Sequence, residues 1–326
     1  MRATVGVLII GVIGCSGTIG GTSGAPDSGM ATVAFTAPSP GTSFTRDSLA
    51  PDFALAADVP VAVVTTGPVA RVAISDGARA LGDVDASGAL HAFVDHAGAA
   101  TLTATAYDSA GASVATATLD VTITDPAAAD CHAWLDLYKV AYTVGPANPG
   151  VVDPVTVQGP IGGVPYRYLG NTSQRATFFM DCQLALSLAK AAPFFHAHDV
   201  MEVEDYGVYN YRCINNDGTP PNCTIGMSQH AYAMAIDLAQ FTTSDGSTYN
   251  VKTDFVINPD GDTCTATPQP GKDAFLHALI CELKGAKVWN IVLTPNYNDL
   301  HRDHFHVDLT PGSDYIKLQL GIPVDE

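Results

Sequence analysis

The segment LHRDHFHVDL, residues 300–309, places three of the chain's ten histidines within six positions. An imidazole can ligate a metal or carry a proton near neutral pH, and a carboxylate can do either as well. In an extended strand, residues two apart face the same side, so His304 and His306 would share a face while Phe305 points into packing. The segment therefore predicts either a metal and proton-transfer site or a polar strand rich in histidine.

A second segment, SQHAYAMAID at residues 228–237, offers two more ligands, since His230 and Asp237 lie seven residues apart. A seven-residue offset returns close to the same face of a helix, and a turn leading into a strand could equally bring the two side chains together. Histidine plus carboxylate is two-thirds of a catalytic zinc set, whose remaining protein ligand is usually another histidine. His306 can supply that ligand, which favours a metal site.

Two residues beside His306 could move protons there. His304 would lie next to the open coordination position, and Asp303 can reach the same site if the chain turns at that point. A zinc ion with three protein ligands and one water lowers the pKa of that water to about 7, and a neighbouring imidazole or carboxylate can then take its proton. Asp303 and His304 are therefore rival candidates for the catalytic base.

The overall composition disfavours nucleic acid as a partner. The 326 residues include 15 Lys and Arg against 33 Asp and Glu, a net charge of −18, and phosphate binding depends on clustered basic residues. A hydrophobic content of 47% with 15% charged residues is typical of packed globular structure, and the length allows two domains. We expect a monomer of more than one domain that binds no nucleic acid.

The N-terminus predicts export. Residues 1–14 contain an early Arg and then an apolar run from Val5 to Ile13, about the length of a signal-peptide core and too short to span a bilayer. The sequence VIGC at residues 12–15 resembles the lipobox of bacterial lipoproteins, which implies that Cys15 carries the lipid. A plain secretory signal with an incidental cysteine is the alternative. We expect an exported lipoprotein, anchored to a membrane at the outer membrane or in the periplasm.

The remaining six cysteines agree with export, because an even number in an exported domain indicates disulfides. All six lie after residue 130. Six cysteines can pair in many ways, and our hypothesis is Cys131–Cys182, Cys213–Cys223 and Cys264–Cys281. A zinc–thiolate site is weakly indicated, because no two cysteines are separated by two residues.

The first half of the chain reads as a tether followed by an all-β unit. Residues 15–29 are rich in Gly, Ser and Thr and lack periodicity, which predicts a flexible tether. Residues 30–125 contain short β-rich runs separated by turn signals, the pattern of a β-sandwich. The segment at residues 100–123 resembles the last hairpin of bacterial immunoglobulin-like domains, which implies a spacer or adhesion module.

The second half, residues 130–326, mixes helices and strands, and we predict an α+β domain around an antiparallel sheet. Residues 131–145 could be a strand or a short helix. Apolar residues at helical spacing predict one helix in residues 175–195, ended by Pro193, and another over residues 272–286. Strands are predicted at residues 199–213, 287–294 and 304–309.

The order of the two ligand segments resembles the LAS metallopeptidases, in which S-x-H-x6-D precedes H-x-x-H-x-H. Within that group, the histidine spacing over residues 301–306 resembles penicillin-insensitive murein endopeptidase. The closest resemblance is to the extensin-like C-terminal family of bacteria, and it covers residues 130–315. It is carried by MDC at residues 180–182, YNYRC at 209–213, SQHAYAMAID at 228–237 and HRDHFHVD at 301–308.

This resemblance implies a zinc-peptidase-like domain in which His230, Asp237 and His306 hold Zn²⁺. D-Ala-D-Ala peptidases place their base at the position of Asp303, whereas the murein endopeptidase has an active-site histidine at the position of His304. The resemblance also implies two candidate substrate-binding residues, Arg212 and His301. Arg212 stands in the order YRC where the family usually has CR, and His301 could also be an exposed loop residue or a partner of the ligands. Ala233 stands where the family usually has Gly.

By this resemblance the expected function is zinc-dependent hydrolysis of amide bonds in peptidoglycan peptides, as a carboxypeptidase or an endopeptidase of the cell envelope. One alternative is a zinc-containing, non-catalytic module that binds the cell wall. Another is a structural lipoprotein whose site is vestigial.

Overall fold

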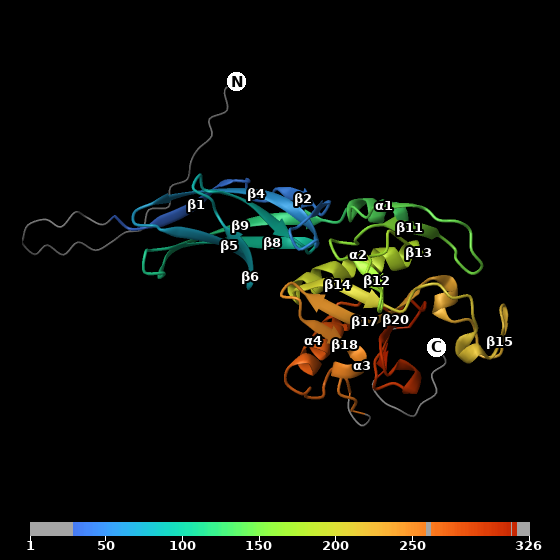
Figure 1. Ribbon diagram of the computed structural model, residues 1–326. Coiled ribbons are helices and arrows are strands. Elements are labelled where there is room, and N and C mark those ends of the chain that lie inside the picture. The colour runs from blue at the N-terminus through green and yellow to red at the C-terminus, as the bar shows by residue number, and fades with distance from the viewer. Residues whose placement is uncertain (1–28, 259–261, 314, 318–326) are drawn as a thin grey trace, which may run out of the picture.

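The computed structural model describes residues 29–258, 262–313 and 315–317. Within these ranges the chain has two parts, an N-terminal β-sandwich and a C-terminal part that mixes helices and sheets (Figure 1). The predicted signal segment, the lipid-bearing Cys15 and the predicted tether up to residue 28 lie outside the described residues. No helix within the described ranges combines the length and apolar character needed to cross a membrane.

The N-terminal part has two packed sheets, as the short β-rich runs predict. Its strands are β1 (Thr32–Ala37), β2 (Ser43–Thr45), β3 (Ser48–Leu49), β4 (Leu55–Thr66), β5 (Arg71–Asp76), β6 (Arg79–Asp83), β7 (Ala89–Val94), β8 (Gly98–Tyr107) and β9 (Ser113–Thr124). One sheet runs β1-β4-β3 with β7 also paired to β4, and the other runs β2-β9-β8-β5-β6. Alternate side chains of β8 and β9 are buried and form a core with the facing sheet.

The C-terminal part contains four α-helices and twelve strands among the described residues. The helices are α1 (Cys131–Leu137), α2 (Cys182–Ala197), α3 (Val251–Asp254) and α4 (Lys272–Gly285). The strands are β10 (Tyr142–Val144), β11 (Pro154–Gln158), β12 (Tyr166–Tyr168), β13 (Thr177–Asp181), β14 (Val200–Asp205), β15 (Gly218–Thr219), β16 (Asn222–Cys223), β17 (Ala235–Thr243), β18 (Thr248–Asn250), β19 (Ile291–Leu293), β20 (Phe305–Asp308) and β21 (Tyr315–Lys317). Short 3₁₀ turns occupy Ile214–Asn216, Gln229–Tyr232 and Asp299–His301.

The main sheet of this part has the order β12-β14-β17-β20-β19-β21, with β18 paired to β17. It is mixed, whereas we predicted an antiparallel sheet: the central pairs are antiparallel, but β12 pairs with β14 and β19 with β21 in parallel. A smaller sheet, β10-β11-β13, lies separately. Helices α2 and α4 pack with the main sheet around one core that includes the fully buried Trp289 and Phe305.

The helix predicted in residues 175–195 differs from the observed one at both ends. Residues 177–181 form β13, and α2 begins only after Asp181, whose carboxylate accepts a hydrogen bond from the Gln183 amide as an N-cap. Pro193 lies inside α2 and does not end it. A proline removes one helical hydrogen bond, but burial of Phe195 beyond it holds the last turn against the core.

The strands predicted over residues 199–213 are only partly present, since Val200–Asp205 pairs as β14 and Cys213 forms an isolated bridge with Met227. The chain then crosses toward the segment SQHAYAMAID. The backbone amides after β14 form hydrogen bonds with that segment and do not extend the strand. The Tyr206 amide donates to the Asp237 carbonyl, and the Asn210 amide donates to the His230 carbonyl.

The two parts of the chain share packed side chains. Phe53, in the turn before β4, stacks on His196 of α2 with ring centroids 5.0 Å apart and planes 18° from parallel. Leu55 at the start of β4 belongs to the core of the C-terminal part. One end of the sandwich is therefore held against α2.

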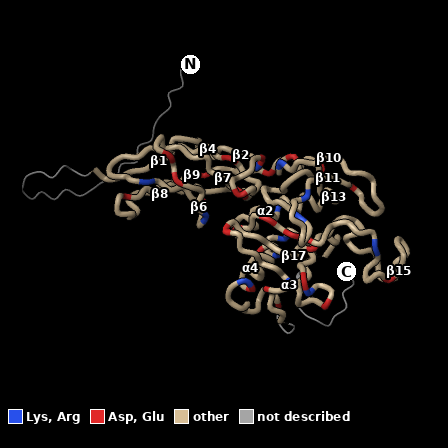
Figure 2. Tube along the Cα trace, viewed as in Figure 1, with Lys and Arg blue, Asp and Glu red and all other residues tan. Residues whose placement is uncertain are grey.

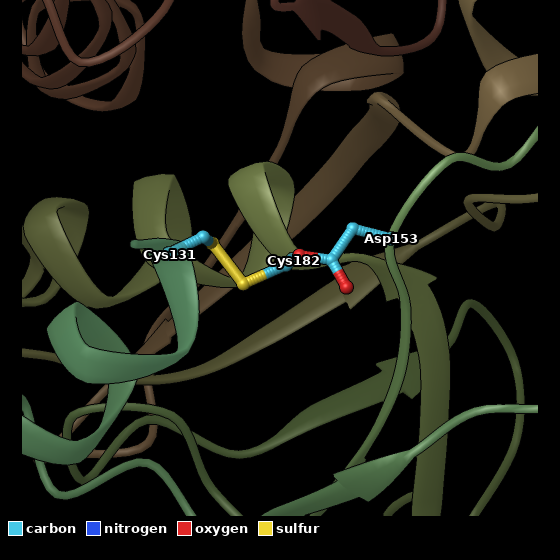
Figure 3. A group of neighbouring side chains, drawn as sticks. All are labelled: Cys131, Asp153 and Cys182. Carbon is cyan, nitrogen blue, oxygen red and sulfur yellow. A yellow bond between two sulfur atoms is a disulfide. The ribbon is translucent and has the colours of Figure 1, made fainter. Parts of the chain in front are cut away.

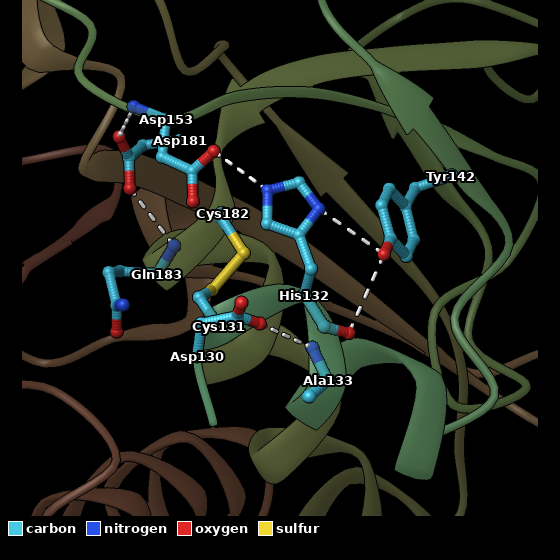
Figure 4. Close-up of a disulfide and its surroundings, with 9 residues drawn as sticks. All are labelled: Asp130, Cys131, His132, Ala133, Tyr142, Asp153, Asp181, Cys182 and Gln183. Atoms are coloured by element: carbon cyan, nitrogen blue, oxygen red, sulfur yellow. Dashed lines mark hydrogen bonds and ion pairs between the residues drawn. A yellow bond between two sulfur atoms is a disulfide. The ribbon is translucent and has the colours of Figure 1, made fainter. Parts of the chain in front are cut away.

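Three disulfides join the six cysteines in the predicted pairs. Cys131 and Cys182 begin α1 and α2, so their bond ties the first turns of two helices together (Figure 3). Beside it, His132 Nε2 lies 2.8 Å from Asp153 Oδ1, and His132 Nδ1 lies 3.2 Å from the Tyr142 hydroxyl (Figure 4). The disulfide and this hydrogen-bond chain together fasten α1 to the small sheet.

Replacing Cys131 and Cys182 together by alanine is expected to lower the free energy of unfolding by about 4 kcal/mol, the chain-entropy value for a bond spanning a sequence separation of 51. The matched control removes Cys213–Cys223, which spans a separation of 10, and should cost about 3 kcal/mol. Urea unfolding of the oxidised proteins measures both. Wild-type stability in the first double variant would contradict the prediction.

Candidate metal centre

Three predicted ligands meet where β17 pairs with β20. In this antiparallel pair Asp237 lies opposite His306, and the Asp237 Oδ1 atom is 2.9 Å from His306 Nδ1. His230 Nε2 lies 3.2 Å from each of those two atoms. One ligand atom from each residue lies within 4.8 Å of the others, and both histidines are buried. The structure thus brings all three residues to one point.

A tight turn delivers His230 to this point, which is the turn-into-strand alternative of the sequence analysis. Ser228 begins the turn, and its hydroxyl accepts a hydrogen bond from the His230 amide. Ala233 ends it in the left-handed region, with φ of 55° and ψ of 30°. Such a conformation favours glycine, which agrees with the glycine usual at this position in the family that the sequence resembles. β17 follows at Ala235 and carries Asp237.

The hydrogen-bond partners of the outer ring nitrogens determine which nitrogen of each histidine carries a hydrogen. His230 Nδ1 lies 2.7 Å from the Val208 carbonyl oxygen, which can only accept, so this nitrogen carries the hydrogen. His306 Nε2 lies 3.1 Å from the Asp308 carboxylate and donates to it in the same way. In neutral rings the inward nitrogens then hold lone pairs, and both face the carboxylate of Asp237. Three electron-rich atoms that converge in this way fit a cation.

Asp237 is ionised in this environment. Burial by itself raises the pKa of its carboxyl group, but where the rings of His230 and His306 are protonated, their charge and their hydrogen bonds outweigh burial and hold this pKa well below its usual range. Two imidazole nitrogens and one carboxylate, each second nitrogen held by a hydrogen-bond acceptor, are a donor set that suits Zn²⁺.

The two candidate bases are in direct contact with each other. His304 Nε2 lies 3.4 Å from Asp237 Oδ1, and its Nδ1 lies 2.9 Å from Asp303 Oδ1. The Tyr206 hydroxyl donates to the other oxygen of Asp303 at 3.4 Å, and its ring meets the His304 ring edge to face. The imidazole therefore stands between Asp303 and the ligand cluster.

Arg212 and His301, the predicted substrate-binding residues, both line the hollow of about 440 Å³ that opens onto the ligands. His301 is buried and is not the exposed loop residue considered above. Its Nδ1 lies 2.7 Å from Asn298 Oδ1, and its ring packs 5.2 Å from that of His304. Arg212 is half-buried and lines the hollow, and its Nη1 atom donates to the Cys213 carbonyl oxygen at 3.4 Å. His301 thus supports the wall, while Arg212 offers a positive charge.

Two other groups of candidate donors each contain a cysteine pair. Their sulfur atoms are joined in disulfides and do not serve as thiolate ligands, as Figure 3 shows for the first group. These groups are Cys131, Asp153 and Cys182, and Cys213, Asp217 and Cys223.

Three residues that contact the ligands or bases differ in how well the sequence predicts their position. Asp308 lies two residues after His306 on the same strand, so its approach to that ring follows from strand geometry. The Val208 carbonyl and the Tyr206 hydroxyl belong to the segment that follows β14, and no spacing pattern relates them to the ligands.

Lys and Arg are spread along the described trace among more numerous Asp and Glu (Figure 2).

The loop before β11 approaches the turn that carries His230, and Gly150 provides a test of whether this contact matters. Gly150 has φ of +83°, and a Cβ atom there would lie 2.4 Å from the carbonyl oxygen of Ala231, next to His230. We expect Gly150→Ala to lower the free energy of unfolding by about 2 kcal/mol or more and to weaken zinc binding.

Gly159→Ala is the matched control, because Gly159 has φ of +76° but a Cβ atom added there would meet nothing within 4 Å. Urea unfolding and zinc titration measure both variants. Equal zinc affinities in the two would mean that the Gly150 loop does not hold the turn.

Comparison with known proteins identifies the C-terminal part. A family model described as extensin-like protein C-terminus matches residues 130–316, more than half of the chain. A comparison with curated proteins gives no match.

Two solved structures show distant similarity. The fibronectin(III)-like modules of Clostridium thermocellum CbhA are 19% identical, with a TM-score of 0.23, and the match covers 28% of this chain and 93% of that one. The SGBP-B protein of the Bacteroides ovatus mixed-linkage glucan utilization locus, in complex with a mixed-linkage heptasaccharide, is 11% identical with a TM-score of 0.22. That match covers 70% of this chain and 49% of the other.

Proposed function

This chain belongs, through residues 130–316, to the family of the extensin-like protein C-terminus, and we propose that this part is a zinc-dependent hydrolase of amide bonds in peptidoglycan peptides. The observation that carries the proposal is the buried cluster of His230, Asp237 and His306 with the His304–Asp303 pair directed at it. The ligand set would hold the metal, and the imidazole of His304, paired with Asp303, would transfer the protons that hydrolysis needs.

His230 Nε2, the Asp237 carboxylate and His306 Nδ1 would hold the zinc ion. When bound, zinc in such a site makes water acidic enough to act as a nucleophile near neutral pH and polarises the carbonyl under attack. Val208 and Asp308 hold the two ligand rings in the tautomers whose inward nitrogens carry no proton.

His304 is the proposed general base and acid. Its Nε2 faces the ligand cluster and takes the proton of the attacking water, while its Nδ1 hydrogen is directed at Asp303. The carboxylate of Asp303 stabilises the imidazolium that forms, and Tyr206 fixes that carboxylate by donating to it. His304 then returns the proton to the amine released from the broken bond. Asp303 acts through His304 in this scheme.

Arg212 is proposed to bind the carboxylate of the peptide substrate. Its side chain lines the same hollow as the ligands, and a guanidinium there can pair with an anionic group through two parallel hydrogen bonds. The similarity of the motifs to those of LAS peptidases supports peptidoglycan as the substrate and a zinc-peptidase-like fold. Export and a lipid anchor at Cys15 would place the protein beside that substrate.

Purified peptidoglycan provides the direct test. The full chain, loaded with zinc, should release soluble peptides with new amino groups, detected by mass spectrometry. A zinc chelator should stop the release, and added Zn²⁺ should restore it. A protein that binds one zinc per chain yet releases nothing from any peptidoglycan type would contradict the proposal.

A non-catalytic wall-binding module is the outcome to distinguish. A binding module needs no relay such as Tyr206–Asp303–His304, and the presence of that relay favours the enzyme. Sedimentation with peptidoglycan that persists in an Asp303→Ala/His304→Ala variant, without products from the wild type, would favour binding alone.

A further inference from the structure

Two further hollows lie beside the one at the metal centre, and neighbouring hollows share wall residues. A smaller hollow of about 180 Å³ shares Arg212, His230 and Asp237 with it as wall residues. That hollow in turn shares Val208 and Tyr209 with a third of about 530 Å³. We call the three neighbouring hollows together the long groove and the third hollow its far end.

The far end lies between the edges of two sheets. β13 is the last strand of the small sheet, and β12 is the last strand of the main sheet. Thr177 and Phe179 of β13 and Tyr168 of β12 line the space between them. The far end is therefore built from regular strands on both sides, which makes it a preformed cleft.

Arg175 holds the aromatic side chains of the far end in place. Both terminal nitrogens of Arg175 bind the buried carboxylate of Asp205, at 2.6 and 2.7 Å. The guanidinium also stacks 3.6 Å from the ring centroid of Tyr168 and 4.2 Å from that of Phe178. A bidentate ion pair that also stacks on two rings holds the aromatic wall in one orientation.

The far end has no uncompensated charge among its described wall residues, because the charge of Arg175 is met by Asp205. The remaining wall side chains are aromatic, aliphatic, hydroxyl or amide groups, including Asn148, Thr156 and Thr177. Tyr168 is 47% exposed. A site of this kind does not select ions; it suits a neutral ligand with an apolar face and many hydroxyl or amide groups.

From these observations we infer that the far end binds saccharide, the glycan to which the hydrolysed peptide is attached. A sugar ring presents C–H groups on one face, which pack on an aromatic ring, and hydroxyl and amide groups at its rim, which hydrogen-bond to side chains such as Thr156 and Thr177. The link to a glycan-attached peptide rests on the proposed function, whereas the saccharide site itself rests on the groove.

Calorimetric titration with a soluble tetrasaccharide of N-acetylglucosamine tests the saccharide site on the zinc-loaded full chain. The wild type should bind it, and Tyr168→Ala should weaken binding at least tenfold. Thr177→Arg, at an exposed position of the same wall, should also weaken it, because the new side chain occupies the groove. Tyr107→Ala is the matched control: Tyr107 of the sandwich is also covered by an arginine, Arg71 at 4.3 Å, and its loss should leave binding unchanged.

Kinetics separate this inference from the proposed function. Tyr168→Ala should raise KM for peptides attached to glycan and leave kcat/KM for sugar-free peptide unchanged. A His230→Ala protein should still bind the tetrasaccharide, since the far end contains no metal ligand among its described wall residues. Absence of wild-type binding, or wild-type affinity in both groove variants, would overturn the saccharide site even if hydrolysis is observed. Saccharide binding without any hydrolysis would refute the proposed function alone.

Discussion

Replacing His230 by alanine is expected to remove zinc and hydrolytic activity together while the protein stays folded. His230 supplies one of three protein ligand atoms, 3.2 Å from each of the other two. Loss of residues that merely orient a ligand weakens metal affinity about 10- to 100-fold, so loss of a ligand should weaken it by about 100-fold or more. Activity that depends on the metal should then fall at least as far.

Zinc content measured by mass spectrometry and competition with a chromogenic chelator give the affinity without any assay of activity. Zinc should also raise the melting temperature of the wild type and not that of the variant, because a ligand stabilises the state that binds it. His132→Ala is the matched control, since His132 also pairs with an aspartate, Asp153, at 2.8 Å outside the site. Stoichiometric zinc in His230→Ala with wild-type affinity would remove the proposed ligand set.

Much of the ligand set could be predicted from spacing. His230 and Asp237 lie on one turn and the strand that follows it, a local relation visible in the sequence. His306 lies 69 residues beyond Asp237, and only the pairing of β17 with β20 places the two opposite each other. Spacing alone does not determine that pairing, so it offered His306 only as a residue able to complete the set, and the order of motifs in the family that the sequence resembles supported that choice.

The order of the relay could not be predicted in the same way. Strand β20 begins at Phe305, so His304 lies just before the paired region, and its side-chain direction depends on contacts with Tyr206 and Asp303. Tyr206 belongs to a segment that reads as strand but binds the backbone of β17 at the carbonyl of Asp237. Tertiary contacts determine both features, and a linear pattern does not record them. Pro193 is a similar case in the fold, since burial of Phe195 outweighs the local preference.

Replacing His304 by alanine is expected to lower kcat by about 100- to 10,000-fold while zinc stays bound, because general acid–base catalysis contributes that much. His304 is not one of the three ligands that converge within 4.8 Å. Asp303→Asn should cost less, since the imidazole remains and only its orientation and the stabilisation of its charge are weakened. Tyr206→Phe should cost least, because its hydrogen bond to Asp303 is long, at 3.4 Å.

The order of these three effects identifies the base. Steady-state kinetics with zinc content measured on each sample gives kcat per metal-loaded site, and added imidazole should restore part of the activity of His304→Ala but none of that of Asp303→Asn. Rescue by imidazole separates proton transfer from a structural role, because a misfolded site would not recover. If Asp303→Asn lost more activity than His304→Ala, the carboxylate would be the base and the imidazole its partner. The distances favour the imidazole as the base. His304 Nε2 lies 3.4 Å from the Asp237 oxygen, whereas Asp303 contacts Nδ1, on the other side of the same ring.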